Sequence, residues 1–196
     1  MIVHKNFFLA ILTVTIIYSV LLFLYADAML LAKTNLDHYV ENDLIVLGKI
    51  FSATELPDKK ETEYQIMVER YLKSPKNVDL ITAFGQGMKS GPFQSSIDII
   101  FDKGNRVLLL LNKIEERYVI SPYSFSAESF NPDFDFILPP LKLYKAGISP
   151  EDIVCRGHLV LVMKSTNGMP ACVRGNHIER LVSVGWLDED FLKSIK

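Results

Sequence analysis

The chain has 196 residues, which is enough for one ordinary domain or two small ones. Its formal net charge is −2, from 21 Lys and Arg against 23 Asp and Glu, and no stretch concentrates basic residues. This composition makes nucleic acid a poor candidate partner, and it leaves no polybasic patch for an anionic membrane surface.

The first predicted element is a membrane anchor in residues 1–28. FFLAILTVTIIYSVLLFLY, residues 7–25, has no charge, proline or glycine, and as a helix it would span roughly 30 Å, the thickness of the bilayer core. With Lys5 before this run and Asp27 after it, we expect a cytoplasmic N-terminus and the rest of the chain outside the cell. Two alternatives stay open: a signal peptide cleaved after Ala28, which would leave a secreted protein, and a buried core helix.

Residues 29–43 have the apolar spacing of an amphipathic helix and are predicted to form a stalk. Residues 44–123 then carry five predicted strands separated by turn signals, a pattern that favours a small antiparallel β-barrel. The strands are expected within residues 42–53, 61–73, 77–85, 106–111 and 116–123.

One of these strands predicts which side chains line the barrel. In ETEYQIMVERYLK, Ile66 and Val68 alternate with Gln65 and Glu69. Because successive side chains of a strand point to opposite faces, we expect the two aliphatic residues inside and the two polar residues in solvent.

Residues 124–140 have the composition of a linker, rich in Ser, Asn, Asp and Pro, but they also contain four phenylalanines. We expect these side chains to pack the linker onto the barrel, with a binding role as the alternative. They are Phe125, Phe130, Phe134 and Phe136.

Residues 141–196 predict a small α+β module. The Asn167-Gly168 pair signals a tight turn between two strands, and a two-residue turn there would place Cys172 opposite Met163.

Helical signals flank this hairpin. Ser149 followed by proline begins a predicted helical turn, and a second helix, capped by Asn176, is expected over residues 177–184. Gly185 then ends the helix, with Trp186 folding back as in a Schellman motif.

Two parts of the chain resemble known families. NDLIVLGKI, EYQIMVERYLKSP, DLITAFG and FDKGNRVLLLL resemble strands of the netrin-like module, the OB-type fold of the tissue inhibitors of metalloproteinases, over residues 36–123. The segment from PPLKLYK to VGW, residues 140–186, is similar to a Cys-pair module of uncharacterised secreted or membrane-anchored archaeal proteins. The first resemblance implies an OB-like barrel, and the second implies no known activity. In the inhibitors an N-terminal Cys binds the protease zinc, but residues 29–154 contain no Cys, so that chemistry is not implied here.

The loop GQGMKSG, residues 85–91, is glycine-rich but lacks the Gly-Lys-Ser/Thr of a phosphate loop. Its Gly85, Gly87 and Lys89 are candidates for contacts with a partner, since loop tips of a barrel often bind. No Ser–His–acid set stands out, so we expect no catalytic residues, no enzymatic activity and no cofactor.

Both cysteines lie in the C-terminal module. Cys155 and Cys172 are expected to form a disulfide, because the chain is predicted to be exported and two cysteines pair with none left over. Free thiols are one alternative. The other is a metal site in which His158 and His177 join the two sulfurs, as the Cys-x2-His and Cys-x4-His spacings would allow.

Combined with the resemblance, these patterns predict an N-terminal transmembrane helix, an all-β, OB-like, five-stranded antiparallel barrel and a small α+β C-terminal module. We expect a membrane-anchored extracytoplasmic binding or adaptor protein, with a protein partner and no catalytic activity. The alternatives are a protease-inhibitor-like protein that acts by loop insertion and an extracytoplasmic metal-binding protein. The oligomeric state does not follow from the sequence.

Overall fold

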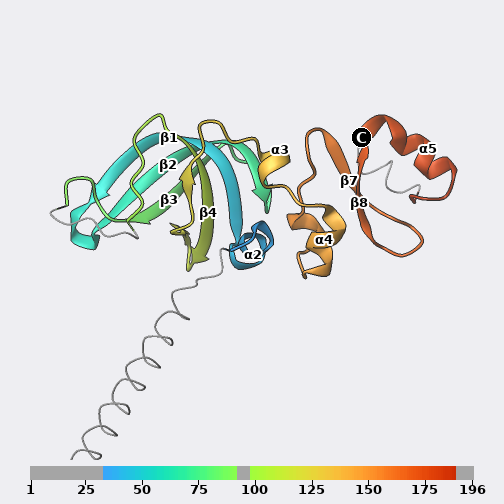
Figure 1. Cartoon of the computed structure of the whole chain (residues 1–196), viewed down its shortest axis with the longest axis horizontal. Coiled ribbons are helices and arrows are strands. Elements are labelled where there is room, and N and C mark those ends of the chain that lie inside the picture. Colours follow the sequence, from blue (N-terminus) through green and yellow to red (C-terminus); the bar gives the residue numbers. More distant parts are fainter. Residues whose placement is uncertain (1–32, 92–97, 189–196) are drawn as a thin grey trace, which may run out of the picture. The chain divides into compact units, whose positions relative to one another are not determined.

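The computed structural model describes residues 33–91 and 98–188, and those from Thr34 onward belong to one compact unit (Figure 1). The predicted anchor, residues 7–25, lies outside the described residues, as do residues 29–32 of the predicted stalk. Among the helices of the described ranges, none is both long and apolar enough to cross a membrane.

A closed, mixed β-barrel of five strands forms the larger part of the unit, in the order β1-β2-β3-β5-β4 with β4 returning to β1 (Figure 1). A short 3-10 turn, η1 (Pro57–Lys59), joins β1 to β2, and a two-residue strand, β6 (Phe125–Ser126), adds to β4. The barrel strands are β1 (Leu44–Leu56), β2 (Glu61–Lys73), β3 (Leu80–Gln86), β4 (Arg106–Ile114) and β5 (Arg117–Ile120). The prediction of a five-stranded barrel is therefore confirmed.

The expectation of a wholly antiparallel barrel is wrong at one strand pair. β3 and β5 run parallel, with Ala83 beside Tyr118 and Phe84 beside Val119. The reason is geometric, because strand directions can alternate all the way round a closed ring only if the number of strands is even. Five strands must therefore include one parallel neighbour pair.

The barrel interior is filled by side chains from all five strands, which form the inner core. The expected alternation in β2 holds for Ile66, which is fully buried, and for Val68, which packs against this core. Glu69 is exposed as predicted, whereas Gln65 is half-buried because its Oε1 accepts a hydrogen bond from Ser52 Oγ at 3.1 Å. The inner core comprises Leu44, Val46, Ile50, Tyr64, Ile66, Ile81, Ala83, Phe101, Val107, Leu109, Leu111 and Ile120.

A second, outer core lies against the other face of β1 and β4. Leu108 and Leu110 of β4 point into it, while Val107, Leu109 and Leu111 of the same strand point into the barrel. Both faces of β4 are thus buried, which explains the unbroken apolar run VLLLL where a one-sided strand would alternate. The other buried residues of the outer core are Tyr39, Ile45, Leu47, Leu72, Ala127, Phe136, Ile137, Leu143, Ile148 and Ile153.

The helix α2 (Asn35–Glu41) is part of this outer core, although its residues fall in the predicted stalk. Thr34 is its N-cap and forms a capping box with Asp37. Tyr39 is fully buried and donates a hydrogen bond to the carbonyl of Leu72 at 2.9 Å. The Lys73 ammonium donates to the carbonyls of Tyr39 and Asn42, so it satisfies acceptors at the helix C-terminus. Burial lowers the pKa of Lys73 and raises that of Tyr39.

The predicted linker, residues 124–140, contains β6 and the short helix α3 (Pro132–Asp135), and its last residue begins the helix α4 (Pro140–Lys145). The expected packing of its phenylalanines holds for Phe136, which is buried beside Tyr39 with ring centroids 5.2 Å apart, and for Phe130, which packs on the same core. It fails for Phe134, whose exposed fraction is 81%.

The C-terminal part has the predicted α+β content. It consists of η2 (Pro150–Asp152), β7 (Leu159–Met163), β8 (Pro170–Arg174), η3 (Gly175–His177) and α5 (Ile178–Ser183). A third core, formed by Val162, Ile178 and Leu187, joins the hairpin to α5.

The register of the β7–β8 hairpin differs from the prediction. Cys172 pairs with Leu161 instead of Met163, because a six-residue loop replaces the expected two-residue turn. In this loop the Lys164 N–H donates to the carbonyl of Met169, and the Asn167 side chain accepts from the Met169 N–H. The wider loop shifts the partner of each β8 residue by two positions.

The predicted end of the last helix is confirmed, and its predicted start is not. Gly185 adopts a left-handed φ of 70°, and the Trp186 N–H donates to the carbonyl of Leu181 at 2.9 Å, as in a Schellman motif. At the start, α5 continues from η3 without a side-chain cap, so Asn176 is not the cap residue. After Ser149 the chain makes only the 3-10 turn η2.

Candidate functional site

The predicted disulfide is present between Cys155 and Cys172, with Cα atoms 5.7 Å apart. Each sulfur is bonded to the other, so neither is a thiolate that could bind a metal in this oxidised state. His158 and His177 are both exposed, and within the described ranges no three His, Cys, Asp or Glu side chains group as metal ligands would. The alternative metal set is therefore not assembled here.

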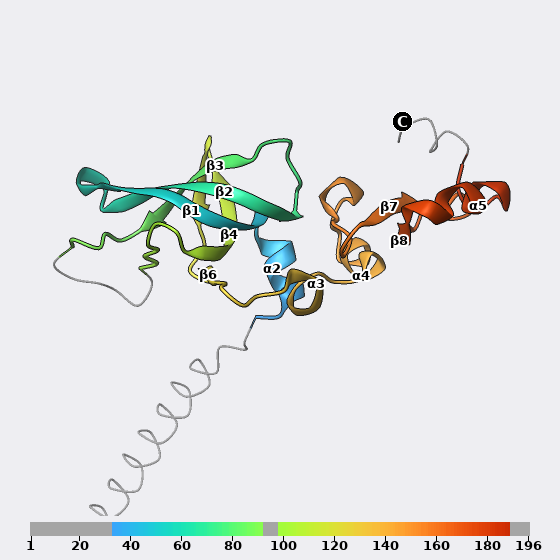
Figure 2. The same cartoon turned by 90° about the horizontal axis from the view of Figure 1, so that it is seen from above.

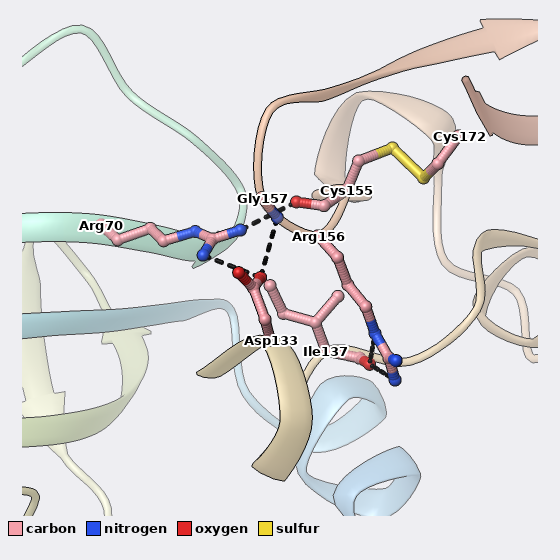
Figure 3. Close-up of a disulfide and its surroundings, with 7 residues drawn as sticks. All are labelled: Arg70, Asp133, Ile137, Cys155, Arg156, Gly157 and Cys172. Atoms are coloured by element: carbon pink, nitrogen blue, oxygen red, sulfur yellow. Dashed lines mark hydrogen bonds and ion pairs between the residues drawn. A yellow bond between two sulfur atoms is a disulfide. The ribbon is translucent and has the colours of Figure 1, made fainter. Parts of the chain in front are cut away.

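The disulfide lies beside a polar cluster that attaches the C-terminal part to the barrel (Figure 3). Arg70 of β2 forms an ion pair with Asp133 at 2.8 Å and donates to the carbonyl of Cys155 at 2.9 Å. The Gly157 N–H donates to the same aspartate at 2.9 Å. Burial alone would raise the pKa of Asp133, but the Gly157 N–H and the Arg70 guanidinium together hold it below its usual value. The hydrogen bonds and the ion pair of this cluster join its members to one another. We therefore interpret the cluster as a structural contact that positions Cys155, not as a reactive site.

The candidate loop residues Gly85, Gly87 and Lys89 each have a structural role in the barrel. Gly85 belongs to β3, where an added Cβ would lie 3.0 Å from the Tyr64 ring, and Gly87 has a left-handed φ of 94°. Lys89 forms an ion pair with Asp102 at 2.7 Å. The two glycines thus permit close approach and a sharp turn, and the three candidates do not converge on one site.

The same loop is held to β1 through Glu55. Its carboxylate accepts hydrogen bonds from the backbone N–H of Ser90 at 2.9 Å and from the Ser90 hydroxyl. The hydroxyl bond, followed by the backbone bond, lowers the pKa of the Glu55 carboxyl. Because the folded pKa lies below the unfolded one, this contact stabilises the fold above the unfolded pKa and is lost as pH falls through the folded value.

We expect Ser90→Ala to return the Glu55 pKa toward the ordinary glutamate value, because the variant removes the hydroxyl donor. An NMR pH titration of the Glu55 side-chain carboxyl measures the shift. Ser52→Ala is the matched control, since its hydroxyl bonds Gln65 and not Glu55. An unchanged Glu55 pKa in Ser90→Ala would contradict the proposed attachment of the loop.

An apolar surface that the sequence analysis did not identify lies on the outside of β1, β2 and β3. It consists of Phe51, Met67, Val78 and Leu80, each about half exposed at 48–51%, and is called the outer patch below. Met67 and Leu80 are direct cross-strand partners. A surface cavity of about 470 Å³ lies here, lined by Phe51, Met67 and Leu80 of the outer patch together with Val68 and Asp79.

Local irregularities of β1 lie beside this surface. Its pairing with β2 shifts between Ile50 and Ser52, and the residue between them, Phe51, faces outward. Gly48 lies at a second shift, where an added Cβ would be only 2.6 Å from the Met67 carbonyl oxygen. The glycine therefore allows β2 to approach β1 beside the outer patch. An outward Met67 agrees with the alternation of β2, but no sequence signal marked the shift at Phe51.

No family model matches the chain, and no curated protein matches it.

Proposed function

We propose that this protein is a membrane-anchored binding or adaptor protein of the extracytoplasmic side, which holds a protein partner on the outer patch and catalyses no reaction. The observation that carries the proposal is the outer patch, since apolar side chains that gather at the surface inside a polar rim are typical of interaction sites. The disulfide supports an oxidising compartment.

The charges around the outer patch favour a polypeptide partner. Lys49 is exposed and is the cross-strand partner of Met67, Lys103 lies 5.8 Å from the centre of the Phe51 ring, and Asp79 lines the cavity. Both signs are thus present within one small area, whereas a nucleic-acid site would present a basic stripe. A protein segment with an apolar side chain flanked by polar groups fits this arrangement.

The architecture supports a barrel of the OB type, which the netrin-like resemblance implies. OB-type barrels are five-stranded and bind their ligands across the face of strands 2 and 3 and the adjoining loops. The outer patch lies on β1, β2 and β3, so it overlaps the face that such barrels use. The inference concerns the position of the site, since a shared barrel does not by itself carry over a function.

We expect the double variant Met67→Ser, Leu80→Ser to lose partner binding by at least about tenfold, because two half-exposed side chains would no longer be buried in the complex. The unfolding free energy should change by less than about 1 kcal/mol, since neither side chain belongs to a core. Proteins retained from native membranes by the full chain and by the variant are compared by quantitative mass spectrometry.

Ile114→Ser is the matched control, because Ile114 is an equally exposed aliphatic residue on β4 outside the outer patch. A partner is assigned only if the double variant loses it and the control retains it. Equal retention by the native chain and by a folded double variant would refute the proposed site.

A further inference from the structure

Phe134 is the most exposed of the large apolar side chains that the structure describes, with an exposed fraction of 81%. It lies on α3, between two carboxylates that already have partners. Asp133 is paired with Arg70, and the Asp135 carboxylate accepts a hydrogen bond from the Asn131 N–H at 2.8 Å. Pro132, the first residue of α3, is buried.

These contacts hold α3 through Pro132, Asp133 and Asp135, while the Phe134 ring stays exposed. Phe136, two residues later, is buried in the outer core. An aromatic side chain held outward by a fixed element differs from a mobile one in a loop, because it is already ordered for contact with another surface.

Phe134 is also close to the point where the chain enters the folded unit. The Asn35 side chain, at the start of α2, donates a hydrogen bond to the backbone carbonyl of Asp135 at 2.7 Å. Figure 2 shows α2 and α3 side by side, in agreement with this hydrogen bond. Phe134 thus directly precedes Asp135, whose carbonyl is hydrogen-bonded to Asn35, the first residue of α2.

The sequence limits how far this entry point can be from the predicted anchor. The uncharged run ends at Tyr25, and the N-cap of α2 is Thr34. Nine residue steps separate them, so even a fully extended chain spans only about 30 Å. With residues 7–25 in a bilayer, the chain therefore tethers α2 within about 30 Å of the end of that run.

We infer that Phe134 inserts into the lipid interface and docks the folded unit on the membrane that holds the anchor. The inference rests on the anchored topology of the proposed function, and it adds a second, lipid-facing surface to the outer patch. Trp and Tyr are enriched at the membrane interface, and Phe is among the residues that interfacial segments bury at the headgroup boundary. A single ring would bind lipid weakly from solution, but the anchor makes the contact intramolecular and raises the effective concentration of lipid. Asp133 and Asp135 beside the ring favour zwitterionic over anionic lipid.

The test uses the full chain in phosphatidylcholine vesicles whose acyl chains carry bromine, a quencher of tryptophan fluorescence. Phe134→Trp is compared with Phe51→Trp, each in the background Trp186→Phe, which keeps an aromatic ring at the only native tryptophan position. We expect lipid quenching at position 134 to be at least about threefold stronger than at position 51, with emission shifted to shorter wavelength. Aqueous acrylamide should show the opposite order.

Phe51 is a suitable control because it is an exposed phenylalanine of the same folded unit, outside α3. If Trp186→Phe disturbs folding, Phe134→Trp and Phe51→Trp are each made with Trp186 kept. The fluorescence of the native chain is then subtracted from that of each variant. Equal lipid quenching at the two positions overturns the docking of Phe134. Failure of the chain to stay with the vesicles overturns the anchor and the docking together. Neither readout depends on a protein partner, so the outer patch is tested separately.

Discussion

Leu109→Ala and Leu110→Ala are each expected to lower the free energy of unfolding by about 3 kcal/mol, although the two residues are neighbours on one strand. In a strand with one solvent face, only every second residue would show such a cost. Here Leu109 fills the inner core and Leu110 the outer core, and both are at most 1% exposed. Chemical denaturation of each variant measures the two costs.

Leu80→Ala is the control for this pair, since Leu80 is also a strand leucine but is half exposed, and its cost should stay below about 1 kcal/mol. A large cost for Leu109 with a small cost for Leu110 would contradict the outer core. That result would mean that α2 and the segment around Phe136 do not cover this face of β4.

Replacing both Cys155 and Cys172 by serine is expected to lower the free energy of unfolding by about 3 kcal/mol, because the disulfide closes a loop with a sequence separation of 17 residues. The decrease in stability should be largest in the β7–β8 hairpin, since an isolated two-stranded hairpin is marginally stable in water. Denaturant unfolding measures the total effect. Amide hydrogen exchange should accelerate more in β7 and β8 than in β2 and β4.

The native chain treated with a reductant is the matched comparison, because it loses the same bond and keeps both sulfur atoms. It should behave like the double serine variant. If neither the variant nor reduction changes the unfolding free energy, the disulfide contributes nothing to stability. Faster exchange throughout the barrel would show instead that the bond stabilises the whole unit, through the Arg70–Asp133 cluster.

Several features followed from residues close together in the sequence or from a residue count. They include the presence of the barrel strands, the end of α5 and the pairing of the cysteines. Alternation in β2 predicted that the Ile66 side chain points into the barrel, since the side-chain period of a strand is two. Gly185 predicted the end of α5, since a left-handed residue costs glycine little. Cys155 and Cys172 are the only two cysteines, so a disulfide within the chain could join no other pair, and the predicted export favoured it over free thiols and a metal site. The anchor in residues 7–25 stays a prediction.

Other features depend on contacts between segments far apart in the sequence. The VLLLL run of β4 indicated burial, but only the arrival of α2 and Phe136 on its outer face explains why Leu108 and Leu110 are buried as well. The parallel pairing of β3 with β5 follows from closing five strands into a ring, which no single strand encodes.

The sequence by itself determined the strand periods, the helix end at Gly185 and the cysteine pair, because each depends on neighbouring residues or on a count. The tertiary structure alone decided which apolar residues remain at the surface. Phe134 and Phe136 are two residues apart and of one type, yet Phe134 stays exposed while Phe136 stacks on Tyr39, beside a cluster in which Arg70 and Gly157 hold Asp133. The shift at Phe51 likewise belongs to the tertiary structure, since the register of a strand pair is a property of two strands together.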